Sequence, residues 1–189
     1  MTAAPANRRA GACLWLTGLS GAGKTTTARA VAQALCRDDR LVTVLDGDEL
    51  RASISADLGF SRADRDAHVR RVAAIARDIV ERGDIAICAL VSPFRDARAA
   101  ARALIGSDRF LEIFVSSPLH ICEQRDPKGL YRRARRGELT HFTGVDDPYE
   151  PPIAPELVIT TVECSVEENV SRILALLLPR WSSGASSLE

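Results

Sequence analysis

Residues 18–26 read Gly-Leu-Ser-Gly-Ala-Gly-Lys-Thr-Thr, and this stretch decides the fold of the chain. An apolar run at 12–17 precedes it, and an amphipathic segment at 28–35 follows it. In the pattern Gly-x-x-x-x-Gly-Lys-[Ser/Thr], glycines turn backbone N–H groups inward onto a phosphate, and the next helix N-terminus adds partial positive charge. The stretch therefore predicts a phosphate-binding loop (P-loop), with nucleotide contacts from Gly18, Leu19, Ser20, Gly21, Ala22, Gly23, Lys24, Thr25 and Thr26.

Two side chains of this loop supply chemistry beyond the backbone cradle. Lys24 is predicted to be a catalytic cation on the β- and γ-phosphates of ATP, and the Thr25 hydroxyl is placed to bind Mg²⁺. GTPases and motor ATPases carry the same loop. However, the chain has no Asn-Lys-x-Asp run to read guanine, and it is short for a motor with coupling modules. A small-molecule kinase remains, with its acceptor pocket after the second strand.

The rest of the chain alternates short apolar runs with segments of helical periodicity. The runs are rich in Val, Ile and Leu, which favours strands buried on both faces of a parallel sheet. Ser61 with Asp64 indicates a capping box for the second long helix, and Gly83 its end. We therefore expect an α/β fold: a parallel five-stranded sheet with helices on both faces, in the three-layer sandwich of P-loop nucleotide kinases, with a lid. The strands are expected at 12–17, 41–46, 85–91, 110–116 and 157–161, and the helical stripes at 28–35, 69–80 and 173–178.

Composition narrows the class of protein. Apolar residues make up 46% and charged residues 26%, with 25 side chains of each sign, which is typical of a soluble globular protein and disfavours a generic nucleic-acid binder. No apolar run approaches the roughly 18 residues of a membrane span. The stretch 1–10 lacks the apolar core of a secretory signal, so we expect a cytoplasmic protein. The five dispersed cysteines are interpreted as buried small hydrophobes in a reducing compartment.

The chain is expected to form one domain between two flexible ends. Residues 1–10 read as a polar lead-in, and 11–180 as the P-loop domain. Residues 181–189 read as a Ser- and Gly-rich tail, whose final Leu-Glu is consistent with an expression-vector remnant.

Two carboxylates, Asp46 and Asp48, stand at the end of the second predicted strand, and Arg51 follows them. Facing the γ-phosphate, one can hold a Mg²⁺ water and the other can accept a proton from the attacking hydroxyl. Alternation along an extended strand would put both on a similar side. A structural alternative, compatible with the first, is an Asp-Gly turn with Asp48 as the cap of the next helix.

An aromatic ring and an arginine stand at the start of the next long helix, as Phe60 and Arg65. Together with Arg51 they can hold an aromatic base and an anionic group. Taken alone, Phe60 is favoured as a hydrophobic staple, and Arg65 has an alternative as a solvated helix charge.

Residues 125–136 hold six cations. Such a run is usually a solvated helix face and sometimes a nucleic-acid patch, which the neutral charge balance disfavours. In a P-loop kinase a third interpretation is a lid, at about 126–145, that closes positive charge over the transferring phosphoryl group. The stretch 141–150 has loop composition and an aromatic pair that can complete the pocket. The six cations are Arg125, Lys128, Arg132, Arg133, Arg135 and Arg136.

Taken together, these residues resemble the adenylylsulfate kinases, from about Cys13 to Leu178. The resemblance rests on four stretches, of which the first is generic and the second and fourth are specific to that family. They are GLSGAGKTT (18–26), LDGDELR (45–51) with DLGFSRADR (57–65), VSPFR (91–95), and RDPKGLYRRARRGELTHFTG (125–144) with PYE (148–150).

The resemblance implies transfer of the γ-phosphate of MgATP to the 3′-hydroxyl of adenylylsulfate (APS), giving PAPS and ADP in sulfate activation. It implies that Asp48 is a catalytic base or orienting group and that Asp46 lies near the metal, beside Thr25. It also implies a homodimer and, as a further partner, an ATP sulfurylase, with no nucleic-acid or membrane partner. The implied substrate contacts are the phosphosulfate at Arg51 and Arg65, the APS adenine between Phe60 and Phe142, a lid contact from Lys128, and the ATP adenine against Arg125.

Three positions depart from the family pattern. His68 stands where Asn is expected to help hold APS, Glu49 follows the Asp-Gly-Asp run, and Ser116 ends a strand where Asp is common. His68 is kept as a substrate-binding residue, because an imidazole can still donate a hydrogen bond. Ser92 matches a serine that carries phosphate in some relatives, but Ser92-Pro93 favours a helix cap followed by proline.

Two other functions stay open at this point. One is a kinase of another small hydroxyl substrate, such as a sugar acid or a nucleoside monophosphate; a sugar acid needs no aromatic sandwich. The other is a nucleotide-binding regulatory module, against which the intact Lys24, Thr25, Asp46 and Asp48 weigh.

Overall fold

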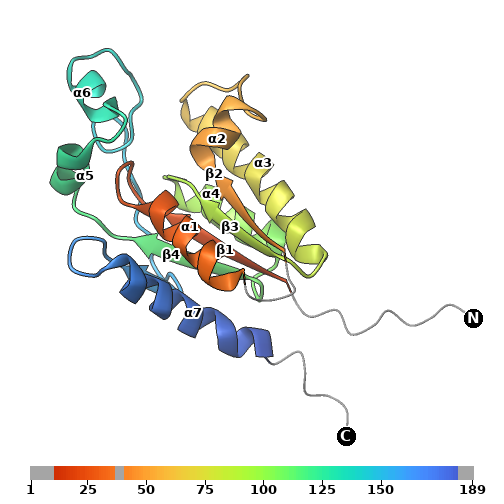
Figure 1. Cartoon of the computed structure of the whole chain (residues 1–189). Coiled ribbons are helices and arrows are strands. Elements are labelled where there is room, and N and C mark those ends of the chain that lie inside the picture. The colour runs from red at the N-terminus through yellow and green to blue at the C-terminus, as the bar shows by residue number, and fades with distance from the viewer. Residues whose placement is uncertain (1–10, 37–40, 183–189) are drawn as a thin grey trace, which may run out of the picture.

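The computed structural model describes residues 11–36 and 41–182, with side chains described as far as Pro179. The predicted lead-in at 1–10 and most of the predicted tail lie outside these residues, but residues 181–182 still belong to the last helix. Figure 1 shows the order of the elements along the chain. They are β1 (Ala12–Thr17), α1 (Lys24–Leu35), β2 (Val42–Asp46), α2 (Gly47–Ala52), α3 (Arg62–Glu81), β3 (Ile85–Ala89), α4 (Arg95–Ile105), β4 (Phe110–Val115), α5 (Leu119–Arg125), α6 (Leu130–Arg135), β5 (Leu157–Ile159) and α7 (Val166–Ser182).

The five strands form one sheet in the order β2-β3-β1-β4-β5, and every neighbouring pair is parallel. This confirms the predicted sheet, although β3 and β5 end two residues earlier than expected. Parallel strands bring their carboxyl ends to one edge of the sheet, where ligands bind in such folds. The loop 18–23 leaves from that edge, directly after β1.

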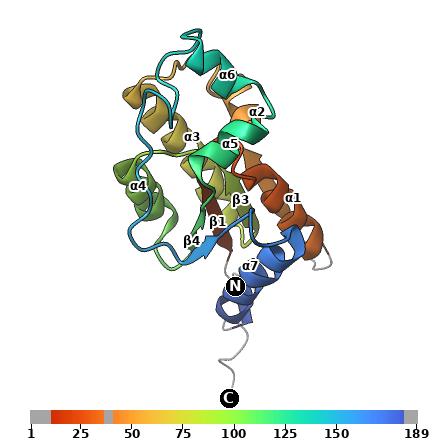
Figure 2. The ribbon, with the colours of Figure 1, turned by 90° about the vertical axis from the view of Figure 1, so that its left-hand side faces the viewer.

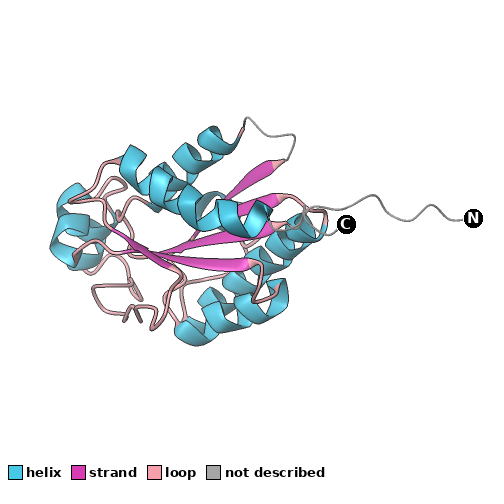
Figure 3. Cartoon of the chain, turned by 90° about the horizontal axis from the view of Figure 1, so that it is seen from below, coloured by secondary structure: helices cyan, strands magenta, loops and turns pink. Residues whose placement is uncertain are grey.

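Helices cover both faces of the sheet, as Figure 3 shows from below. Trp15 of the central strand packs into the core beneath α3 and α4, and its neighbours Leu14 and Leu16 pack into the core beneath α1 and α7. Successive residues of β1 are therefore buried on opposite faces, which explains why the strands read as continuous apolar runs. The three-layer prediction is confirmed.

Some of the predicted helix caps and ends are present in the structure, and others are not. Ser61 caps α3: its hydroxyl accepts the Asp64 N–H and donates to the Asp64 carboxylate. Gly83, with φ of 88°, follows the end of α3 as predicted. The cap of α2 is Asp46 instead of Asp48, because β2 ends at Asp46 and the Asp46 carboxylate accepts the N–H of Asp48. The strand does not extend to Asp48, so the condition for the predicted alternation of the two carboxylates is not met.

Ser92 does not cap α4, as predicted from its position before a proline. The helix begins only at Arg95, with Phe94 in the cap position. The Glu150 carboxylate accepts the Arg95 N–H from another part of the chain. The Ser92 hydroxyl is instead buried against Trp15.

The cysteine prediction holds for three of the five residues. Cys13, Cys88 and Cys122 are buried free thiols. Cys36 is exposed at the end of α1, and Cys164 is half-buried, so the interpretation as buried hydrophobes is wrong for these two. Among the described residues, no helix has the length and apolarity needed to cross a membrane.

Candidate active site

A cleft of about 1110 Å³ opens at the carboxyl edge of the sheet, beside α2, α5 and α6, which gather at one end of the molecule in Figure 2. It brings together most of the side chains that the sequence singles out. Gly18, Leu19 and Ala22 lie outside its lining; Ala22 is buried beneath the loop. The predicted residues that line the cleft are Ser20, Gly21, Gly23, Lys24, Thr25, Thr26, Asp46, Asp48, Arg51, Phe60, Arg65, His68, Arg125, Lys128 and Phe142.

The loop 18–23 needs glycine at two points. Gly23 has φ of 99° and caps α1 without a side-chain hydrogen bond, so the N–H groups of the first helical turn stay available to an anion. A Cβ on Gly18 would lie 2.5 Å from the Val115 carbonyl oxygen. The backbone can therefore take the phosphate-binding conformation only with glycine at these positions.

Lys24 is buried in the first turn of α1. Its ammonium donates to the carbonyls of Gly18 and Leu19, at 2.9 and 2.7 Å, so the loop folds around its own cation. Burial lowers the pKa of the Lys24 ammonium from 10.5 to about 8, although nearby Asp48 opposes this shift. A weakly solvated ammonium beside free N–H groups forms a phosphate site.

The lowered pKa of Lys24 predicts that nucleotide affinity depends on pH. The Lys24 amine is mostly protonated below about pH 8. Above this pH, binding of each MgATP requires that Lys24 take up a proton from solution. We expect the association constant for MgATP, measured by equilibrium fluorescence, to be constant up to pH 7.5 and to fall about tenfold per pH unit above 8. The Lys24→Arg variant is the control, because its guanidinium does not titrate there, and its profile should be flat. A flat profile for the unchanged protein between pH 7 and 9 would contradict this assignment.

Thr25 and Asp46 form a small oxygen site at the end of β2. The Thr25 hydroxyl donates to Asp46 Oδ2 at 2.7 Å, and Asp46 is buried. The described residues contain no cluster of three or more His, Cys, Asp or Glu of the kind that encloses a metal ion. The hydroxyl and the carboxylate nevertheless suit Mg²⁺, which commonly takes one or two protein oxygens and completes its shell with phosphates and water.

Asp48 stands in the first turn of α2 and extends into the cleft, where it forms an ion pair with Lys128. Lys128 comes from the turn between α5 and α6, so this contact joins the two sides of the cleft. The structure therefore brings together two residues that the sequence assigns separately, Asp48 to the acceptor side and Lys128 to the expected lid. A substrate hydroxyl that approached Asp48 would have to share it with Lys128 or displace Lys128.

Arg51 and Arg65 flank the ring of Phe60, with guanidinium carbons 4.9 and 5.6 Å from the ring centre. Phe60 is 51% exposed, so it is not the buried staple that its position alone favours. Arg65 is buried and donates to the Phe60 and His141 carbonyls, so it is not a solvated helix charge. Burial and the charge of Arg51 both lower the pKa of Arg65. Two confined cations beside a ring form a site for an anion attached to an aromatic group.

His68 lines the cleft from α3, as the sequence predicts. Its Nδ1 lies 3.0 Å from the hydroxyl of buried Ser55. Burial, together with the charge of Arg51, lowers the pKa of His68 to about 4, so the ring is neutral at physiological pH. The imidazole therefore adds no charge to the corner formed by Arg51 and Arg65.

The cation run at 125–136 divides into two groups. Arg125 and Lys128 line the cleft. The remaining four form ion pairs with acidic side chains of the same region and do not line the cleft. They therefore match the alternative of a solvated helix face and not that of a charged lid surface. They are Arg132 with Asp126, Arg133 with Glu138, Arg135 with Glu123, and Arg136 with Glu138.

Two residues that contact the P-loop, one lining the cleft and one buried beside it, were not singled out from the sequence. Thr161 donates to the Ala22 carbonyl and accepts from Arg125, both at 2.8 Å, so it fastens Arg125 to the loop. Its place just after β5 was a signal, because ligands gather at strand ends. Tyr131 is buried, donates to the Ser20 carbonyl at 3.0 Å and meets the Phe142 ring edge-on at 5.0 Å. Nothing in its sequence context, within a cation run, indicated this role.

Comparison with known proteins gives one consistent family. Residues 10–160 match the profile described as adenylylsulphate kinase. An adenylyl-sulfate kinase of Synechococcus sp. (strain JA-3-3Ab) is 50% identical over 169 residues, covering 89% of this chain and 95% of that protein. The adenylyl-sulfate kinase of Bacillus pumilus (strain SAFR-032) is 49% identical over 168 residues, covering 89% and 85%. The solved structure of Mycobacterium tuberculosis APS kinase CysC in complex with AMPPNP and APS has a TM-score of 0.85 at 42% identity, covering 89% and 98%.

Proposed function

The chain belongs to the adenylylsulfate kinase family, and we propose that it is an adenylylsulfate kinase that transfers the γ-phosphate of MgATP to the 3′-hydroxyl of APS. The products are PAPS and ADP. The observation that most supports APS as the acceptor is that Arg51 and Arg65 flank the ring of Phe60 in the same cleft as Asp48. An adenine can stack on the exposed ring while the phosphosulfate pairs with the guanidiniums.

The reaction needs little covalent chemistry from the protein. The 3′-oxygen of APS forms a bond to the γ-phosphorus, the bond from that phosphorus to the ADP oxygen breaks, and the hydroxyl proton passes to the Asp48 carboxylate. Because the transition state is loose, Asp48 chiefly orients the hydroxyl and accepts the proton late. Lys24 and the N–H groups at the start of α1 stabilise charge on the transferring oxygens.

Thr25 and Asp46 would hold Mg²⁺, which when bound would supply positive charge to the phosphates of ATP. In the protein without substrate, Thr25 and Asp46 hold each other by a hydrogen bond, which keeps both oxygens in place. The same Asp46 carboxylate caps α2 and so fixes the backbone of Asp48. One carboxylate therefore links the position of the metal site to that of the catalytic base.

The division of the cleft into a nucleotide side and an acceptor side is part of the proposal. Arg125 and Thr161 lie beside the loop and suit the ATP adenine, whereas Phe60 and Phe142 suit the APS adenine. The stretch 126–145 is proposed as the lid. Its contacts support this, since Lys128 reaches Asp48 and the His141 carbonyl accepts from Arg65.

Two finer expectations about partners rest on the family resemblance. We propose a homodimer, which light scattering of the purified protein would reveal as twice the mass of one chain. We also propose an ATP sulfurylase as a partner, since that class of enzyme makes APS. A cytoplasmic location, where MgATP is available, belongs to the same proposal.

The substrate assignment predicts which acceptor drives ADP release. In a coupled assay with MgATP, we expect kcat/KM for APS to exceed that for AMP by at least about 100-fold, because AMP lacks the sulfate that completes the anion. Gluconate, which has no ring to stack on Phe60, should give no turnover above background. Equal turnover with AMP, or no ADP release that depends on APS, would rule out the assignment. Release with gluconate alone would favour a sugar-acid kinase.

A further inference from the structure

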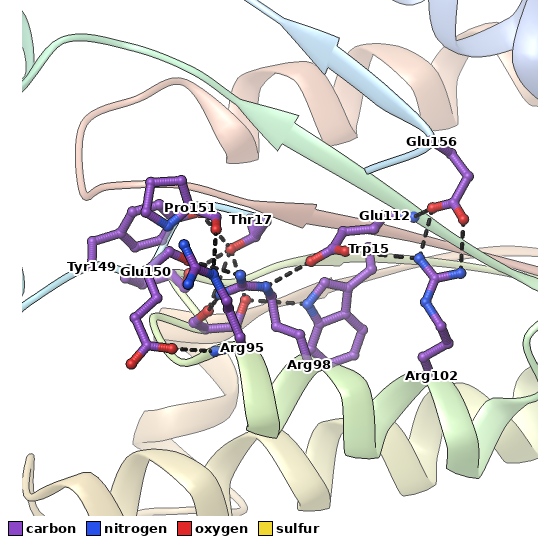
Figure 4. A network of polar contacts seen from close by, with 12 residues as sticks. Trp15, Thr17, Arg95, Arg98, Arg102, Glu112, Tyr149, Glu150, Pro151 and Glu156 are labelled. Carbon is purple, nitrogen blue, oxygen red and sulfur yellow. Dashed lines mark hydrogen bonds and ion pairs between the residues drawn. The ribbon is translucent and has the colours of Figure 1, made fainter. Parts of the chain in front are cut away.

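A buried polar network lies behind the cleft, and none of the roles above uses it. Figure 4 shows it around Arg98 of α4. The Arg98 side chain is only 3% exposed, and its donors reach three separate parts of the chain. Nε donates to Glu112 of β4 at 2.6 Å, Nη1 to the Ser92 carbonyl at 2.7 Å, and Nη2 to the Glu150 carbonyl at 2.8 Å. A planar guanidinium with three fixed acceptors holds these segments in one geometry.

The segment that follows the lid is fastened to this network at 149–150. Glu150 donates its N–H to the Pro93 carbonyl at 2.9 Å, and its carboxylate accepts the N–H of Arg95 at 2.8 Å. The Tyr149 hydroxyl lies 3.0 Å from the hydroxyl of Thr17, the last residue before the P-loop. The segment that follows the lid is thus tied both to the start of α4 and to the end of the central strand.

The second segment that Arg98 holds is the turn after β3, which lines the cleft with Val91, Ser92 and Pro93. Ser92 has φ of 38°, in the left-handed region that non-glycine residues rarely adopt. Its hydroxyl accepts from Trp15 at 3.1 Å and lies 3.0 Å from that of Thr17. Such a conformation persists only where several contacts over-determine it, and the bond from Arg98 to the Ser92 carbonyl is one of them.

We propose that Arg98 is a positioning residue for the acceptor substrate: it holds the Ser92 turn and residues 149–150, which follow the lid, in the geometry that fits APS. The inference rests on the proposed function. Arg98 does not line the cleft, so it acts on the substrate indirectly. It acts through residues 91–93, which line the cleft, and through the lid, which Tyr149 follows in the chain. The nucleotide side, formed by the P-loop with Arg125 and Thr161, makes no contact with Arg98 among its described bonds.

The same helix offers a matched control in Arg102. Arg102 pairs with Glu156 at 2.7 Å and lies 3.7 Å from the Glu112 carboxylate. Its described hydrogen bonds go to Glu156 and to the Phe110 carbonyl, so it shares the acidic partner of Arg98 but not the two carbonyls. Lysine is the substitution of choice at both positions, because it keeps a cation beside Glu112 at position 98 and beside Glu156 at position 102.

The test compares Arg98→Lys with Arg102→Lys in steady-state kinetics. For Arg98→Lys we expect KM for APS to rise about tenfold while KM for ATP stays within about twofold. The reason is that displaced residues 91–93 and a displaced lid would hold APS less well in its reactive position. Both variants should lower the melting temperature by similar amounts, but Arg102→Lys should leave KM for APS within about twofold of the unchanged protein. Equal shifts of KM for APS in the two variants, or no shift in Arg98→Lys, would overturn the proposal.

Tyr149→Phe gives a second test if Arg98→Lys does not fold. It keeps the ring that stacks on Phe114 at 5.9 Å and removes only the bond to Thr17. We expect KM for APS to rise about threefold with an unchanged melting temperature. Hydrogen exchange separates this inference from the proposed function. Arg98→Lys should accelerate exchange of amides 141–152 relative to Arg102→Lys whatever the acceptor is, and identical exchange in the two variants would overturn the positioning role.

Discussion

Replacing Lys24 with Met is expected to lower kcat for PAPS formation by about 100- to 1000-fold, the usual loss when one preorganised donor to the transferring phosphoryl group is removed. Lys24 is the cation around which the loop folds, with bonds to the Gly18 and Leu19 carbonyls. Single-turnover kinetics at saturating MgATP would measure the effect on the chemical step. Met keeps the length of the side chain and therefore its packing.

Stability distinguishes this loss of activity from unfolding. Burial lowers the pKa of Lys24 from 10.5 to about 8, so at pH 7 the folded state holds a charge that it disfavours relative to the unfolded chain. Removing that charge should offset much of the loss of the two bonds to the loop carbonyls, so the melting temperature should change by only a few degrees. Arg77→Met, on an exposed face of α3, is the matched control and should keep full activity. A Lys24→Met protein that melts lower in proportion to its lost activity would contradict the catalytic assignment.

Replacing Asp48 with Asn is expected to lower kcat by about 100- to 10,000-fold, because a general base usually contributes this much. The substitution keeps the shape of the side chain and the N–H bond to Asp46, so α2 should stay in place. It removes the acceptor for the 3′-hydroxyl proton and the charge that pairs with Lys128. The dissociation constant for MgATP should change by less than about threefold, because ATP is held mainly by the loop.

Asp78→Asn is the control for this variant, since Asp78 is an exposed carboxylate on α3 that pairs with Arg77. It should retain the activity of the unchanged protein. An Asp48→Asn variant that loses MgATP binding, with kcat restored at saturating nucleotide, would show that Asp48 holds the nucleotide. A variant with kcat within threefold of the unchanged protein would show that Asp48 is not the base.

The sequence predicted the fold closely because the determinants of the fold are local. The P-loop glycines require left-handed backbone, as the φ of 99° at Gly23 shows, and the apolar runs reflect burial on both faces. Ser61 and Asp64 lie three residues apart, so their bonds could be predicted from spacing alone. The candidate site residues also gather as expected, because parallel strands bring their ends to one edge.

The prediction for Ser92 was wrong because it depends on bonds between segments far apart in the sequence. Ser92 precedes a proline, which suggested a helix cap. In the structure the Arg95 N–H donates to the Glu150 carboxylate, and the Ser92 hydroxyl accepts a hydrogen bond from Trp15. Asp46 caps α2 because β2 ends at Asp46, as expected, and the backbone turns into the helix at Gly47 instead of staying extended as far as Asp48. The Arg98 network joins α4 to three other segments, two of them through backbone carbonyls, which carry no sequence signature.

The position of the transferred phosphate tests the central claim most directly. The protein is incubated with APS and ATP labelled at the γ-phosphate, and the product is treated with a 3′-nucleotidase. Our account predicts that the label enters a product with the mass of PAPS, only when APS is present, and that the nucleotidase releases all of it while regenerating APS. Label found at another position of APS, or only as inorganic phosphate, would contradict it.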